Sequence, residues 1–123
     1  MVISNNLHEL KHAQEAMEDF QATKPSIFQK FINMIQLTRQ FQYGYQFMGS
    51  LIMDEDPIKY HPMSQDEYVL SVYLGEIERL KKDDQFLELK QLLRQYKNLS
   101  YFNISKLALG ESPKALVGPI VVR

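Results

Sequence analysis

The sequence contains no cysteine. This absence excludes disulfide bonds, cysteine-ligated zinc, iron–sulfur clusters and thiol catalysis. The chain also lacks an uninterrupted apolar run of the roughly 20 residues that a membrane-spanning helix requires, and residues 1–6 lack the basic start and the apolar core of a secretory signal. We therefore expect a cytoplasmic protein with no membrane association.

Sequence patterns of the common catalytic loops are missing as well. None of the five glycines forms a G-x-G-x-x-G arrangement, and no G-x-S-x-G is present. A nucleotide-binding loop and a serine nucleophile therefore have no support. The net charge of −1 provides no overall basic field for a nucleic-acid backbone. These absences favour a protein that is not an enzyme, and they argue against nucleic acid as its partner.

The composition is typical of one soluble globular domain. The chain has 123 residues, of which 45% are hydrophobic and 24% are charged. These proportions are ordinary for a domain that buries its own core. Residues 1–123 are therefore predicted to form a single domain.

Apolar residues recur at helical spacing along most of the chain, which predicts an all-α fold. A first helix is expected over residues 4–22. A second is expected over residues 26–53, after Pro25 and the capping-box pair Ser26 and Gln29. A strand is the alternative over residues 41–47, because aromatic residues alternate there with Gln and Gly. Helix is favoured because the apolar stripe continues in phase through this segment.

Three more helices are predicted in the C-terminal half, over residues 65–80, 84–98 and 101–109. Ser64 and Glu67 form a capping box at the first of these starts. The run Lys81-Lys82-Asp83-Asp84 places cations at a helix end and caps at a new start, which favours a tight turn. One uninterrupted helix over residues 65–98 is the alternative. Gly110 is expected to end the last helix.

The predicted architecture is a bundle of four to five helices with a short extended C-terminal tail that contains the β-prone Ile120 and Val122. The acidic run Asp54-Glu55-Asp56 lies in the main loop and lacks the ligand spacing of an EF-hand, so a solvated loop tip is expected there. The core predicted from the apolar stripes consists of Leu10, Met17, Phe31, Met34, Phe41, Leu70, Leu74, Ile77, Leu89 and Leu93.

The only catalytic signature is His8-Glu9-Leu10-Lys11-His12. H-E-x-x-H on a helix is the pattern by which two histidines bind zinc beside a general-base glutamate. In a zinc metalloenzyme, His8 and His12 would be ligands, Glu9 would be the base, and His61 would be the remaining histidine able to join them. On a helix, Glu15 and Asp19 share the face of the two histidines.

Two features of the sequence argue against a zinc enzyme. The extended pattern H-E-x-x-H-x-x-G-x-x-H fails, because Glu15 stands at the glycine position and Glu18 at the last histidine position. Lys11 also places a cation inside the motif. We therefore expect a solvated helix face, with neither a metal nor another cofactor.

Aromatic and methionine side chains are plentiful, with seven Tyr, seven Phe and six Met. Such residues supply the anchors and the adaptable surface of protein interfaces. Tyr43 and Phe47 lie off the main stripe of the second predicted helix, so another subunit is expected to cover them, and the tail with Ile120 and Val122 is expected to pair in the same way. The sequence therefore predicts a small non-enzymatic regulator or adaptor that binds a protein partner and forms a homodimer.

A nucleic-acid-binding helical regulator is the remaining alternative. It rests on the cations between residues 79 and 97 and on the helical break among them. Acidic residues are interleaved with these cations, however, and mixed charge is the ordinary pattern of a solvated helix face.

Overall fold

The structure is a computed structural model that describes residues 2–56 and 67–111. Within these residues it contains six helices and no strand. The all-α class is therefore confirmed, and the predicted count of four to five helices is too low by at least one. The helices are α1 (Val2–Thr23), α2 (Pro25–Thr38), α3 (Gly44–Met53), α5 (Glu67–Leu80), α6 (Asp84–Leu93) and α7 (Tyr101–Ala108).

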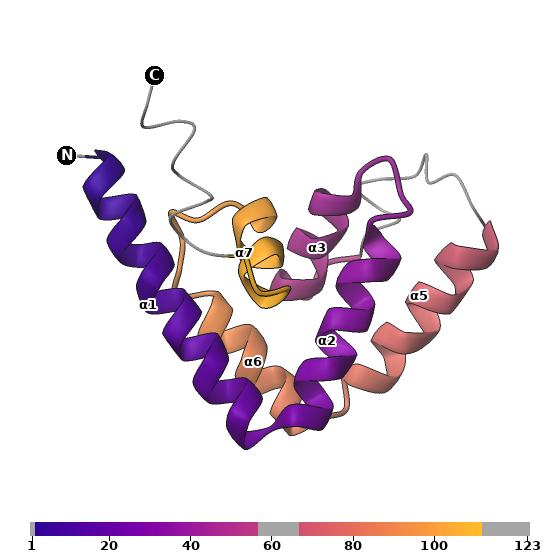
Figure 1. The fold of residues 1–123 in the computed structure, drawn as a ribbon. Coiled ribbons are helices and arrows are strands. Elements are labelled where there is room, and N and C mark those ends of the chain that lie inside the picture. The colour runs from indigo at the N-terminus through magenta and orange to yellow at the C-terminus, as the bar shows by residue number, and fades with distance from the viewer. Residues whose placement is uncertain (1, 57–66, 112–123) are drawn as a thin grey trace.

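The helices are arranged around a V that α1 and α2 form (Figure 1). Lys24 joins the two arms, and its backbone N–H donates to the carbonyl of Phe20 at 2.8 Å. Helices α3 and α7 lie between the arms and contact each other, while α7 also contacts α1 and α3 also contacts α2. Helix α6 contacts α1, α2 and α3, and α5 packs on α2. The interior of the V is therefore filled by short helices.

The helix predicted over residues 26–53 is two helices, α2 and α3, separated by the turn at residues 39–43. At the end of α2, the Thr38 hydroxyl donates to the carbonyl of Ile35 at 2.7 Å. Gly44 then starts α3 against this end, where a Cβ atom would lie only 2.4 Å from the carbonyl oxygen of Thr38. The strand alternative for residues 41–47 is also wrong, because this segment is turn and then helix.

The break after residue 80 is confirmed, so the uninterrupted helix over residues 65–98 is wrong. Asp83 caps α6 by accepting the backbone N–H of Gln85 at 2.9 Å. Helix α6 ends at Leu93, earlier than predicted, and turns follow before α7. Ser100 caps α7 by accepting the N–H of Asn103 at 3.1 Å, and Gly110 follows its end with a φ of 98°. This positive φ is the conformation that glycine allows after a helix.

The core contains all ten predicted residues, with eight of them buried and Leu70 and Leu74 partly buried against the others. Its aromatic centre joins three elements, because Phe47 of α3 lies 4.6 Å from Phe41 and 5.6 Å from Tyr73 of α5, centroid to centroid. The Tyr73 hydroxyl donates to the carbonyl of Phe47 at 3.1 Å. Among the described residues, no helix combines the length and the apolar character needed to cross a membrane.

Candidate functional site

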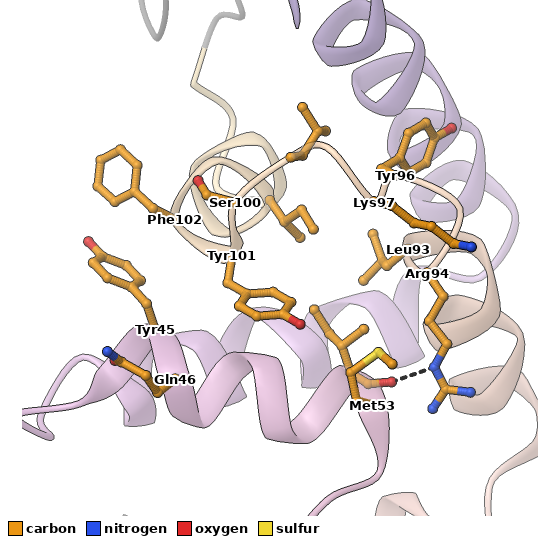
Figure 2. Close-up of a pocket in the computed structure, with 13 residues that line it drawn as sticks. Tyr45, Gln46, Met53, Leu93, Arg94, Tyr96, Lys97, Ser100, Tyr101 and Phe102 are labelled. Atoms are coloured by element: carbon orange, nitrogen blue, oxygen red, sulfur yellow. Dashed lines mark hydrogen bonds between the residues drawn. The ribbon is translucent and has the colours of Figure 1, made fainter.

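A hollow with a cavity volume of about 810 Å³ lies where α3, α6 and α7 meet (Figure 2). Pockets that bind small molecules or side chains of a partner commonly have volumes of about 300–1,000 Å³. Most of the residues that line it are apolar or aromatic. They are Tyr45, Gln46, Ile52, Met53, Leu93, Arg94, Tyr96, Lys97, Leu99, Ser100, Tyr101, Phe102 and Ile104.

The wall of this hollow depends on a close approach of α7 to α3. A Cβ atom at Gly49 would lie 2.4 Å from Cε2 of Tyr101, a distance that no packed pair of carbon atoms tolerates. The missing side chain at Gly49 therefore lets the ring of Tyr101 lie directly on α3. Glycine has a low helix propensity. The contact with Tyr101 explains why a glycine nevertheless lies within α3.

One end of the hollow is aromatic. The rings of Tyr45 and Phe102 meet edge to face, with centroids 5.1 Å apart. They are nevertheless 43% and 38% exposed, and Met53 at the mouth is 47% exposed. Lys106 places its ammonium 5.4 Å from the centre of the Phe102 ring. Large apolar side chains that stay partly exposed around a concave surface are typical of interaction sites.

The other end is cationic. Arg94 donates from Nε to the carbonyl of Ile52 at 2.7 Å and from Nη2 to Oδ2 of Asp54 at 3.1 Å. Lys97 is exposed, and within the described part of the chain it makes no hydrogen bond or ion pair. Arg94 and Lys97 are the charged residues among the described residues that line the hollow, and none of these lining residues is acidic. The hollow therefore favours an anionic group at this end.

Asp54 anchors the cationic end from outside the hollow. It follows α3 in the left-handed conformation, with a φ of 58°, and it also accepts a hydrogen bond from the buried Lys90. Burial raises the pKa of Asp54, but the hydrogen bonds from Lys90 and Arg94 together with their positive charges lower it by more, so the net pKa lies below its usual value. Residues 54–56 are exposed, as expected for a loop tip, but the sequence did not predict that Asp54 joins α3 to α6 through ion pairs with Lys90 and Arg94.

The H-E-x-x-H residues lie elsewhere, on α1. His8, Glu9 and His12 line a shallow depression together with Gln95, Tyr96 and Asn98. Nδ1 of His12 lies 2.7 Å from the Tyr96 hydroxyl. Burial and the charge of Glu9 raise the pKa of Tyr96.

Within the described residues, no group of three or more His, Asp or Glu side chains is placed to hold a metal ion. His61 lies outside these residues. Glu15 and Asp19 are exposed on α1, on the helix face predicted for them. Within the described residues, the motif thus contributes a contact between α1 and the segment after α6, made by His12 and Tyr96.

The structure describes two of the four predicted interaction residues, Phe47 and Tyr43, and they differ in burial. Phe47 is 0% exposed and packs on Phe41 and Tyr73, so the prediction that another subunit covers it is corrected: its own chain does so, because the turn before α3 brings Phe41 onto it. Tyr43 is half-buried against the core. Ile120 and Val122 lie outside the described residues.

The sequence analysis missed Tyr45 and Phe102 as surface aromatics. For Phe102 a signal exists, because the buried residues of α7 are Ile104, Ser105, Leu107 and Ala108, and position 102 lies off this stripe at helical spacing.

Comparison with known protein families, curated proteins and solved structures finds no match to this chain. The function is therefore argued from the site.

Proposed function

We propose that this protein is a non-enzymatic, cytoplasmic interaction module, a small regulator or adaptor, whose hollow between α3, α6 and α7 receives an apolar segment of a protein partner. The observation that carries this proposal is the exposure of Tyr45, Met53 and Phe102 around the mouth of the hollow. Aromatic and methionine side chains are enriched in the cores of protein interfaces. Buried Leu93 and Ile104 provide an apolar floor for the partner's anchors.

Charge limits what the partner segment can be. Within residues 2–56 and 67–111, Arg94 and Lys97 line the hollow and no acidic residue does, so an acidic segment is attracted and a basic one is repelled. An amphipathic helix that carries apolar anchors one turn apart, with acidic residues beside them, fits this description. We therefore assign the hollow to an acidic amphipathic segment.

Site-specific photo-cross-linking in the source cell tests the proposal. A photoreactive benzoylphenylalanine replaces Met53 at the mouth of the hollow, and in the matched control it replaces Leu87, which is 40% exposed on α6 and does not line the hollow. We expect one protein adduct from position 53 that is absent from position 87, with the cross-link mapped to an apolar segment that contains acidic residues. The same adducts from both positions, or none, would contradict the proposal.

The homodimer stays a prediction, with a changed basis. Phe47 is internal, so the dimer prediction now rests on the exposed apolar side chains that line the hollow, Tyr45, Met53 and Phe102. Light scattering separates the two occupants: a mass near twice 14.5 kDa, together with a cross-link from position 53 to a second copy, would assign the hollow to self-association. A cross-link to nucleic acid would support the nucleic-acid alternative.

A further inference from the structure

The two ends of the hollow differ in chemistry. Figure 2 shows Tyr45 and Phe102 at one end, Arg94 and Lys97 at the other, and the ring of Tyr101 between them. Among the lining residues, aromatic carbon therefore stands at one end and positive charge at the other. Lys106, whose ammonium lies 5.4 Å from the centre of the Phe102 ring, is not among them. We propose that the hollow recognises an apolar group joined to a carboxylate, held in one orientation with the carboxylate beside Lys97. This inference rests on the proposed function and specifies what the partner segment presents.

Lys97, rather than Arg94, is the residue that binds the carboxylate. Arg94 already donates to the Ile52 carbonyl and to Asp54, and it shares the charge of Asp54 with Lys90. Lys97 has no such partner among the described residues. Its ammonium has three N–H donors, and none of them is taken up by an acceptor of the described residues. Of the two cations that line this end of the hollow, Lys97 is therefore the one whose donors are not engaged within the described residues.

Tyr101 provides a second donor. Its hydroxyl makes no hydrogen bond within the described residues, and Figure 2 shows it directed away from Tyr45 and Phe102, toward the side of Met53 and Arg94. The ring is held in this direction because it lies against α3 at Gly49. A carboxylate accepts several hydrogen bonds at once, so the Tyr101 hydroxyl is a further donor for a carboxylate held on this side of the hollow.

Three amphiphiles of equal chain length, namely decanoate, decanol and decylammonium, test this inference on the intact chain. Decanoate stands in for an apolar side chain with a carboxylate nearby. Binding is followed by two-dimensional NMR of the ¹⁵N-labelled protein, below the micelle concentration of each probe. We expect decanoate to bind most tightly, with shifts at Tyr45, Lys97 and Phe102.

The Lys97→Gln variant isolates the charge. It is expected to weaken decanoate binding about fivefold, the size of an exposed ion pair, and to leave decanol binding unchanged. Lys82→Gln is the matched control, because Lys82 is exposed in the turn before α6 and does not line the hollow, and it should change neither. Lys97→Glu should reverse the order, so that decylammonium binds more tightly than decanoate. Tyr101→Phe should weaken decanoate binding with less effect on decanol.

Equal affinities for decanoate and decanol, an equal loss of both in Lys97→Gln, or no binding of decanoate would overturn the inference. The two proposals fail separately. A cross-linked protein partner without any preference for decanoate would leave the interaction module standing and refute carboxylate recognition. A preference for decanoate that depends on Lys97, without any cross-linked protein, would refute the interaction module and leave a binding site for amphipathic carboxylates.

Discussion

The ring of Tyr101 occupies the space that a side chain at residue 49 would need. With Cβ added at Gly49, three ring atoms of Tyr101 would lie within 2.9 Å of it. This contact packs α7 against α3. It forms one wall of the hollow from residues that are far apart in the sequence. The hollow therefore depends on a glycine that local helix propensity disfavours.

Gly49→Ala is expected to destabilise the protein by about 1–3 kcal/mol, because overpacking outweighs the gain of about 1 kcal/mol in helix propensity. Gly75→Ala is the control, since its nearest neighbouring atom, in the side chain of Arg79, lies 3.9 Å from the added Cβ. That variant should gain stability. Urea denaturation of both variants checks this, and equal stability of the two would show that the contact at Gly49 is loose.

Asp54→Asn is expected to lower the free energy of unfolding by about 1–2 kcal/mol near neutral pH, because it leaves the ammonium of Lys90 buried without its counter-charge. Asparagine tolerates the left-handed conformation at this position, so the backbone is not strained. Because the folded protein holds the pKa of Asp54 below 3.8, its carboxylate stabilises the fold above that pH. This stabilisation is lost as the pH falls through the lowered pKa.

The measurement for Asp54 is urea denaturation of the native chain and of Asp54→Asn across a pH series. The gap between the two should be widest near neutrality and should shrink below about pH 4. A gap that is constant down to acidic pH would mean that the loss comes from something other than the ionised carboxylate.

The contact between His12 and Tyr96 is expected to contribute about 1 kcal/mol to stability, the typical net value of a hydrogen bond. A double-mutant cycle with His12→Ala and Tyr96→Phe should report a coupling of about this size. His8→Ala is the control, because His8 is exposed and one turn away. A coupling near zero would show that the two side chains do not act together.

Zinc is expected at well below one ion per chain in protein purified without an affinity tag. A zinc site in a protein has three or four protein ligands, and the described residues offer His8 and His12 without a third acid or histidine placed beside them. Metal analysis by mass spectrometry checks this. Stoichiometric zinc that disappears in the His8→Ala, His12→Ala double variant would instead establish the metalloenzyme alternative.

Local signals in the sequence predicted much of the fold. The helical stripe of residues 4–22 corresponds to α1, and the charge reversal at residues 81–84 marks the real break before α6. The split between α2 and α3 was missed because the apolar stripe keeps its phase through the turn at residues 39–43. An apolar stripe indicates which side chains are buried, but it does not show whether the backbone is helical. Phe41 in this turn is buried as deeply as a helical residue, so the stripe is not interrupted there.

The site was less predictable because it is tertiary. Arg94 meets the Ile52 carbonyl and Asp54 across about 40 residues of sequence, and no local pattern encodes such a meeting. The aromatic residues were recognised as interface material, but the sequence assigned Phe47 to the surface and did not single out Tyr45. Their roles depend on where α3 begins, which the close packing of Gly44 on Thr38 decides.

The most direct test of the central claim is the cross-linking yield from position 53 in the native background and in a Tyr45→Ala, Phe102→Ala double variant. Both side chains are exposed by more than a third, so the variant should stay folded by circular dichroism. If these rings anchor a protein partner, the yield should fall by about tenfold or more, as expected for the loss of interface hot spots. An unchanged yield from a folded double variant would contradict the assignment of the hollow as the binding site.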